Sequence, residues 1–278
     1  MAQIEGEKID NISSLASSLF MELASEARLS ILLSLKRKPA KLSTLAREHD
    51  TTVQEVYRNL NRLMQEGLVE KGVDGLFHLT EFGLMVMDQL PYFMFLKNHR
   101  RFLEEHDLLK SGVPSKFLRR IGELEQCKTV NSVTAVLQKL KKLESSANQS
   151  LKAIIAQALP EEVSLVVERM QRGVDVSVIT GQNTIVPKDF IKDFSPTLEK
   201  FFSEKVLKHR MVDRVPVSVH IADNKQAAVM FPDKHGEIDL SILFVSDDPK
   251  FCEWCSDLFE YFWQQSRPFS LKKTKVVE

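Results

Sequence analysis

Apolar residues recur at helical spacing along the N-terminal part of the chain. They stand three or four positions apart over residues 9–23, which predicts a helix with Asp10 as its N-cap. A second helix is expected after Ser25. It ends in the cationic run 36–38 before Pro39, because cations in a last turn and a proline beyond it are helix stop signals.

Two further helices are predicted after a short connection. Ser43 is expected to cap a short helix over residues 44–48. Thr52 and Glu55 have the spacing of a capping box and predict a longer helix, which Gly67 ends. The polar residues of this longer helix share one side, opposite its apolar residues: Gln54, Arg58, Asn61, Arg62 and Gln65.

A hairpin and one more helix complete the N-terminal pattern. Short apolar strands at 68–71 and 76–79 flank the sequence Gly72-Val73-Asp74-Gly75, whose Asp-Gly pair suits a hairpin turn. Thr80 is expected to cap a helix over residues 81–89. The order of three helices, a hairpin and a helix predicts a winged helix-turn-helix domain over residues 10–90.

The remainder of the chain predicts a helical connector and a C-terminal α/β domain of the sensor type, so the fold class is α+β and multidomain. The connector covers residues 91–126 and is rich in aromatic residues, and the C-terminal domain covers 127–278. In that domain helices are expected at 130–158 (one long helix or two), 161–172 before Gly173, 186–213 and 251–265. Strands are expected at 174–179, 215–222, 226–231 and 238–245.

Composition and charge narrow the function classes. The 278 residues carry 38 basic and 38 acidic side chains, which excludes a wholly basic nucleic-acid coat and an acidic tail protein. The charge is nevertheless uneven, since residues 28–71 hold nine basic against five acidic residues and residues 97–143 hold eleven against five. Two basic stretches between acidic ones favour a DNA-facing module joined to a regulatory module.

Cysteine usage and hydropathy predict a cytoplasmic protein. The three cysteines are an odd number in a long chain, which favours a reducing compartment over a disulfide scaffold. The longest apolar run, at 90–96, is far too short for a membrane span, and the first ten residues lack the features of a secretion signal. No membrane partner is therefore expected.

The predicted helix after Thr52 has the properties of a DNA-recognition helix. Arg58 can form a bidentate contact with guanine, and Gln54 or Asn61 can pair with adenine. Other residues of this region are placed for the phosphate backbone or the minor groove. The full set of candidate DNA-binding residues is Thr51, Thr52, Gln54, Tyr57, Arg58, Asn61, Arg62 and Lys71.

The N-terminal motifs resemble those of known regulators. The segments 28–32, 65–69 (Gln-Glu-Gly-Leu-Val) and 79–83 (Leu-Thr-Glu-Phe-Gly) are similar to the ArsR-type and MarR-type winged helices of prokaryotes, in which this last pair of patterns marks the wing. Metal-sensing members of those families use Cys/His clusters. Because no cysteine precedes Cys127, neither a metal nor a cofactor is expected here.

A second resemblance covers most of the remaining chain. His106-Asp107-Leu108, the segment 117–124, Ile238-Asp239-Leu240-Ser241 and the segment 259–263 are similar to archaeal transcriptional regulators that include the methanogenesis regulatory protein family. Membership implies a homodimer that binds double-stranded DNA. The resemblance leaves the ligand of the C-terminal domain open, and we expect that domain to couple a small-molecule effector, or another partner, to DNA affinity through residues 91–126.

Candidate ligand-binding residues come from the predicted strand ends, where small molecules usually bind in α/β sheets. They are Thr180, Gln182, Asn183, Arg210, Arg214, His220 and Asp223.

Three alternatives stay open. The segments 172–180 and 259–263 also resemble the phospholipase D-like fold. The chemistry of that fold needs a His-x-Lys pair, and the sequence contains no such pair. An enzyme is therefore not expected, and a hydrolase is the less favoured alternative. Cys252 and Cys255, three positions apart at a helix start, suit a redox switch, although buried structural thiols are commoner. The third alternative is a winged helix that binds protein instead of DNA.

Overall fold

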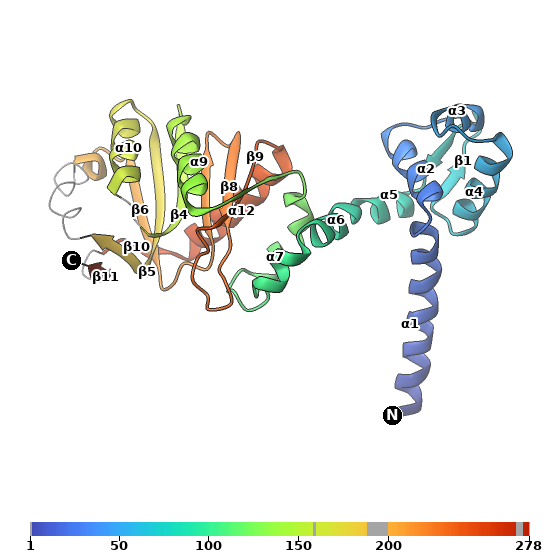
Figure 1. Cartoon of the computed structure of the whole chain (residues 1–278), viewed down its shortest axis with the longest axis horizontal. Helices are drawn as coiled ribbons and strands as arrows, with labels where there is room; N and C mark the ends of the chain where they lie inside the picture. The colour runs from blue at the N-terminus through green and yellow to red at the C-terminus, as the bar shows by residue number, and fades with distance from the viewer. Residues whose placement is uncertain (1, 158–159, 188–199, 271–274, 278) are drawn as a thin grey trace. The chain divides into compact units, whose positions relative to one another are not determined.

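The computed structural model of the chain describes residues 2–157, 160–187, 200–270 and 275–277 (Figure 1). The chain divides into two compact units, residues 1–90 and residues 91–278. We describe each unit by itself.

The first unit is a winged helix-turn-helix, as the sequence predicts. Its elements in chain order are α1 (Ala2–Leu23), α2 (Glu26–Arg37), α3 (Leu42–Glu48), α4 (Val53–Gln65), β1 (Val69–Lys71), β2 (Phe77–Leu79) and α5 (Glu81–Asp88). The two strands pair antiparallel, with Val69 opposite Leu79. Ala40 extends this hairpin sheet through two backbone hydrogen bonds with Phe77, of 2.8 and 3.0 Å.

Helix caps confirm most of the predicted starts and correct two of them. The hydroxyls of Thr52 and Thr80 accept hydrogen bonds from backbone N–H groups three residues on, at 3.2 and 2.9 Å. Asp10 does not cap α1, because the good helix formers before it let the helix begin at Ala2. Ser43 does not cap α3, since the half-buried Leu42 is already helical and the cap position is Lys41.

The capping box at the start of α4 is only half formed. Thr52 caps the backbone N–H of Glu55, but the Glu55 carboxylate does not return to the cap. It accepts a hydrogen bond from the hydroxyl of Thr51 at 2.8 Å. The side chains of both threonines are therefore engaged locally in holding the first turn of α4.

The wing is fixed to α5 by the residues of the two wing motifs. The Thr80 hydroxyl donates to the carbonyl oxygen of Gly67 at 2.6 Å and accepts from the N–H of Gly83 at 2.9 Å. Gly67 adopts φ +77°, which favours glycine. A Cβ on Gly83 would lie 2.1 Å from the carbonyl oxygen of the fully buried Leu68. The close packing of α5 on Leu68, the residue before β1, thus requires a glycine at position 83.

The second unit is built on a nine-stranded mixed sheet of order β10-β6-β5-β4-β7-β8-β9-β3, with β11 beside β5. Strand β5 is parallel to its neighbours β4, β6 and β11. All other neighbouring strands in this sheet are antiparallel. Its strands are β3 (Lys128–Asn131), β4 (Ser150–Gln157), β5 (Asp175–Pro187), β6 (Leu207–Val212), β7 (Ser218–Ala222), β8 (Gln226–Met230), β9 (Ile242–Ser246), β10 (Arg267–Pro268) and β11 (Lys275–Val277).

Helices cover both faces of this sheet. They are α6 (Leu90–Asn98), α7 (Arg100–Glu105), α8 (Ser115–Leu118), the 3-10 helix η1 (Ile121–Leu124), α9 (Val133–Ser145), α10 (Pro160–Gln171) and α12 (Pro249–Gln265). Helices α9 and α10 pack on one face and α12 on the other (Figure 1). Phe95, Phe102 and Phe117 share the α12 core with Phe244 and Trp254, so residues 91–126 form an integral layer of the second unit, not a free connector.

Two strands replace predicted helices. Residues 130–158, expected as one helix or two, form the end of β3, α9 and the central strand β4. A central strand of a sheet covered on both faces is apolar on both sides, so its sequence loses the alternation that distinguishes a strand from a helix. Strand β6 likewise lies within 186–213, of which residues 188–199 lie outside the described residues.

Residues with positive φ end a helix and form a hairpin turn in the second unit. Gly173 follows α10 with φ +85°, as expected of a residue that ends a helix. Asp223 and Asn224 adopt φ of 54° and 53° in the hairpin between β7 and β8. Gly, Asn and Asp adopt positive φ more readily than other residues, so such turns can be predicted from the sequence alone.

Candidate nucleic-acid interface

Helix α4 divides into a buried face and a polar face. Val56, Leu60 and Leu63 are at most 1% exposed and pack in the core of the first unit. Gln54 and Arg58 are exposed, and Asn61, one turn further on, is half-buried. At positions i, i+4 and i+7 these three side chains form a single stripe along the helix. This is the geometry that a recognition helix needs.

Arg58 is the best placed of the candidate base-contacting residues. Its side chain forms no ion pair with any other described residue, so its guanidinium is available for a bidentate contact. Tyr57 beside it is 51% exposed, and Thr52 at the start of the helix is also exposed. The positive end of the helix dipole and these side chains together suit a phosphate group.

The wing presents a further cation. Lys71, at the end of β1, is exposed, and its Nζ lies 5.6 Å from the centre of the Phe77 ring. The turn after it, with Gly75 at φ +76° and a fully exposed Val73, extends the hairpin away from the core. The wing thus carries Lys71 on a short rigid arm that can contact a DNA backbone.

Arg62 is engaged within the first unit. Its Nη2 forms an ion pair with Oε1 of Glu22, a residue of α1 whose side chain is only 9% exposed. The same carboxylate lies 2.7 Å from Nε of Arg28 through its other oxygen. Sequence reasoning did not single out Glu22, because no local motif links it to a residue 40 positions away.

The predicted ligand-binding residues do not form one site. Thr180 is hydrogen-bonded to His209 (2.9 Å) and Gln182 to Asp213 (2.8 Å). Arg210 donates to Ser266, and Arg214 donates to the carbonyl oxygen of Gly236 (2.7 Å). The Asp223 carboxylate accepts hydrogen bonds from the three backbone N–H groups of residues 148–150. The side chain of Asn183 lies outside the described residues. Each described side chain therefore has a separate structural partner.

His220 belongs to a buried polar group on the α9 face of the sheet. Its Nδ1 lies 2.9 Å from Oε1 of Glu144, and its Nε2 lies 3.4 Å from Oγ of Ser218. Ser218, His220 and Gln157 are the polar residues that line a small pocket of about 20 Å³, whose other lining side chains, such as Leu140 and Met230, are apolar. That volume holds about one water molecule.

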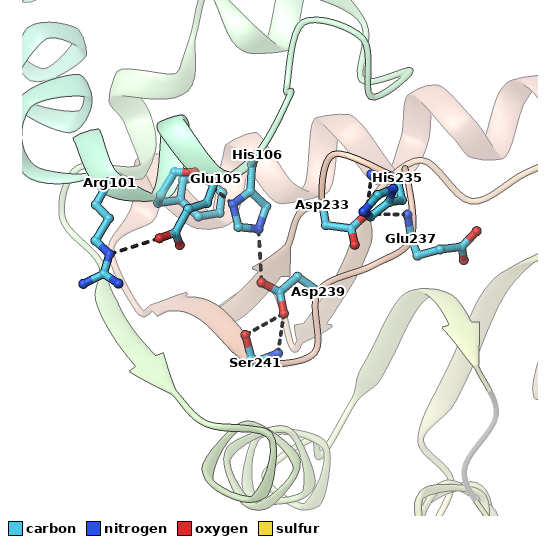
Figure 2. Close-up of polar contacts among 9 residues, drawn as sticks. Arg101, Glu105, His106, Asp233, His235, Glu237, Asp239 and Ser241 are labelled. Atoms are coloured by element: carbon cyan, nitrogen blue, oxygen red, sulfur yellow. Dashed lines mark hydrogen bonds and ion pairs between the residues drawn. The ribbon is translucent and has the colours of Figure 1, made fainter.

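Two of the regulator-like motifs meet in the second unit (Figure 2). His106, buried at the end of α7, places Nε2 3.1 Å from Oδ2 of Asp239 and Nδ1 2.9 Å from the carbonyl oxygen of Phe102. Asp239 also accepts hydrogen bonds from the N–H and hydroxyl of Ser241, at 2.8 and 2.6 Å. These contacts anchor α7 to the loop between β8 and β9.

The two neighbouring cysteines are buried thiols. Cys252 and Cys255 are 4% and 0% exposed. Burial, with Asp248 and Asp247 nearby, raises the pKa of Cys252 to about 11, and burial raises the pKa of Cys255 well above its ordinary value. Because the thiolate is the reactive form, these raised pKa values lower the reactivity of both residues at neutral pH and do not favour the redox alternative.

The described residues contain neither a candidate metal site nor a candidate membrane span. No cluster of three or more His, Cys, Asp or Glu in this part of the chain could hold a metal ion. No helix within the described ranges is long and apolar enough to cross a membrane.

Comparison with known families follows the division into two units. Residues 18–99 match the HVO_A0261 N-terminal domain, and residues 128–265 match the middle domain of the methanogenesis regulatory protein FilR1. A winged helix with an exposed recognition helix, followed by this middle domain, defines a DNA-binding transcriptional regulator of the archaeal type. More particularly, the chain resembles the methanogenesis regulatory protein family.

Solved structures show weaker similarity. The archaeal chromatin protein TrmBL2 is 12% identical over 88% of this chain and 94% of that chain, with a TM-score of 0.40. The phospholipase D family member Nuc of Salmonella typhimurium (17% identity, 52% of this chain, 97% of that chain, TM-score 0.37) and NucT from Helicobacter pylori (16%, 51%, 100%, 0.40) are also similar. At these scores the similarities support no functional conclusion. No curated protein matches the sequence.

Proposed function

We propose that α4 enters the major groove and recognises base pairs through Gln54, Arg58 and Asn61, with Lys71 of the wing on the phosphate backbone. The exposed stripe on α4, with Arg58 unpaired among the described residues, is the observation that carries this proposal. Arginine is suited to guanine, and the two amides to adenine, by the geometry of their hydrogen-bonding groups.

The protein acts as a homodimer on a pseudo-palindromic site. The support is the exposed apolar surface of α1, where Ile12, Leu15, Phe20 and Met21 are between 53% and 66% exposed. Large apolar side chains left exposed along one long helix are typical of an interface. We infer that α1 of a second copy of the chain covers this surface, because a two-fold symmetric operator requires a symmetric dimer. The two half-sites of the operator are then one turn of the DNA helix, or a multiple of it, apart.

The second unit couples a small-molecule effector to DNA affinity. The buried group of Ser218, His220 and Glu144 beside an apolar pocket supports this role, since ligand sites combine apolar walls with a few polar groups. The pocket has room for about one water molecule, so an effector can enter only if a lining element, such as α9 or the segment that holds Ile238 and Leu240, is displaced. Such a displacement is the conformational change that regulation needs.

The protein acts by binding, without catalysis. Phospholipase D chemistry takes its nucleophile and its phosphate anchor from a His-x-Lys pair, and the sequence contains no such pair. The polar groups of the second unit therefore serve structure or recognition.

Fluorescence anisotropy across a salt series tests the DNA-binding proposal. The labelled duplex from upstream of the protein's own gene is compared with a random duplex of equal length. We expect tighter binding to the upstream duplex and a slope of several released counterions. Equal affinity for both duplexes would refute base recognition at that site, and no binding at low salt would favour a protein partner for the winged helix.

A further inference from the structure

Three side chains, two of them largely buried, form an ionic group between α1, α2 and the recognition helix. Glu22 stands in the last turn of α1, and Arg28 in the first turns of α2. Arg28 donates to the carbonyl oxygens of Met21 (2.8 Å) and Glu22 (3.2 Å) as well as pairing with the Glu22 carboxylate. A cation at the carbonyl end of α1 also complements its helix dipole. Arg28 therefore holds the end of α1 onto α2.

The Glu22 carboxylate extends this group to α4. Its Oε1 pairs with Arg62, which belongs to the last turn of the recognition helix. One turn earlier in α1, the hydroxyl of Ser18 donates to Oε1 of Glu66 at 2.7 Å. Two separate contacts thus join the end of α1 to the end of α4, where no backbone hydrogen bond connects them within the described chain.

Arg62 is poorly placed for base contacts. At 100° per residue it lies about 80° around the α4 axis from Gln54 and about 40° beyond Arg58, at the edge of the stripe that Gln54, Arg58 and Asn61 share. Its partner Glu22 is 9% exposed, whereas Arg62 itself is 49% exposed. Withdrawing Arg62 to a phosphate would leave a largely buried carboxylate with one fewer counter-charge, which is costly.

We propose that Glu22 and Arg62 are positioning residues for DNA recognition. They hold α4 at a defined angle on α1, so that Arg58 and its neighbours meet the base edges, and Arg62 itself contacts no phosphate. This inference rests on the proposed DNA-binding function of the first unit. It also makes α1, the helix with the exposed apolar surface, part of the machinery that orients the recognition helix.

A double-mutant cycle in DNA binding tests the proposal. The variants Glu22→Gln, Arg62→Gln and the pair are measured on the operator and on random duplex across a salt series. We expect each single variant to weaken operator binding about tenfold more than random binding, and the pair to be no worse than either single variant. The salt slope should stay that of the wild type, because no phosphate contact is removed.

If Arg62 instead contacts a DNA phosphate, a different result is expected. Arg62→Gln would then lower the slope by about one, weaken both duplexes equally and add its effect to that of Glu22→Gln. That outcome would overturn the proposal. Lys71→Gln is the matched control, since Lys71 is an exposed cation on the wing and should show this phosphate signature.

The design separates this inference from the proposed function and from misfolding. If Glu22→Gln does not fold, Arg62→Lys takes its place: it keeps the charge near Glu22, and a positioning role predicts partial recovery of operator preference over Arg62→Gln. Wild-type protein without operator preference would overturn the proposed function and this inference with it. Selective wild-type binding with additive single variants would overturn the inference alone.

Discussion

Gly83→Ala tests whether the contact between α5 and Leu68, the residue before strand β1, limits the stability of the winged helix. The added Cβ would lie 2.1 Å from the carbonyl oxygen of Leu68, so the helix and the strand must separate by about 1 Å. The same carbonyl accepts the N–H of Thr80 at 3.1 Å, and that bond lengthens as the two elements move apart. The substitution therefore strains both the packing and the cap of α5.

The expected magnitude follows from three contributions. Overpacking costs about 1–3 kcal/mol, and a weakened hydrogen bond costs about 1 kcal/mol. Alanine in place of glycine within a helix regains about 1 kcal/mol. The net loss is about 2 kcal/mol, which lowers the melting temperature of a unit of this size by about 10 °C.

The two tryptophans allow the units to be followed separately. Trp254 and Trp263 both lie in α12 of the second unit, so their fluorescence reports the unfolding of that unit alone. Circular dichroism reports the helices of both units. We expect Gly83→Ala to shift an early circular dichroism transition while the fluorescence transition stays unchanged.

A matched control lies in the same helix. Leu84 is 45% exposed, and Leu84→Ala should change stability by about 0.5 kcal/mol or less. If Gly83→Ala proved as stable as Leu84→Ala, the close approach of α5 to Leu68 would not limit stability, and the reasoning would be refuted.

Three further predictions concern recognition, pH and thiols. Arg58→Ala should cost about 1–3 kcal/mol in operator binding and relax base preference at one position, measured by anisotropy on substituted operators; equal losses on operator and random duplex would contradict base recognition. Burial lowers the pKa of His209 below its unfolded value near 6.5, so the unfolded chain binds the extra proton and the stability of the second unit, followed by tryptophan fluorescence, should fall as pH drops below about 6.5. His209→Phe, which can keep the stacking on Phe269, should flatten that dependence. Operator affinity should not respond to dithiothreitol or to Cys252→Ser, and a response to either would revive the redox alternative.

The local signals in the sequence predicted the N-terminal unit closely. Caps at Ser25, Thr52 and Thr80 and the left-handed glycine at 67 act within a few residues, so their effect is visible without the fold. The polar stripe on α4 also depends only on helical spacing. Strand β4 could not be recognised in the same way, because being covered on both faces removes the alternation that marks a strand.

The sequence by itself determined the winged helix, its recognition helix and the exposure of Gln54 and Arg58, since these depend on short-range spacing and capping. Only the tertiary structure decided which of the remaining polar residues are engaged. In the sequence, Arg62 is as plausible a DNA-contacting residue as Arg58, but in the structure it forms an ion pair with Glu22 of α1. His220, predicted as a ligand-binding residue at a strand end, is paired with Glu144 of α9. Such pairings join residues far apart in the chain, and the packing of helices and strands against one another creates them.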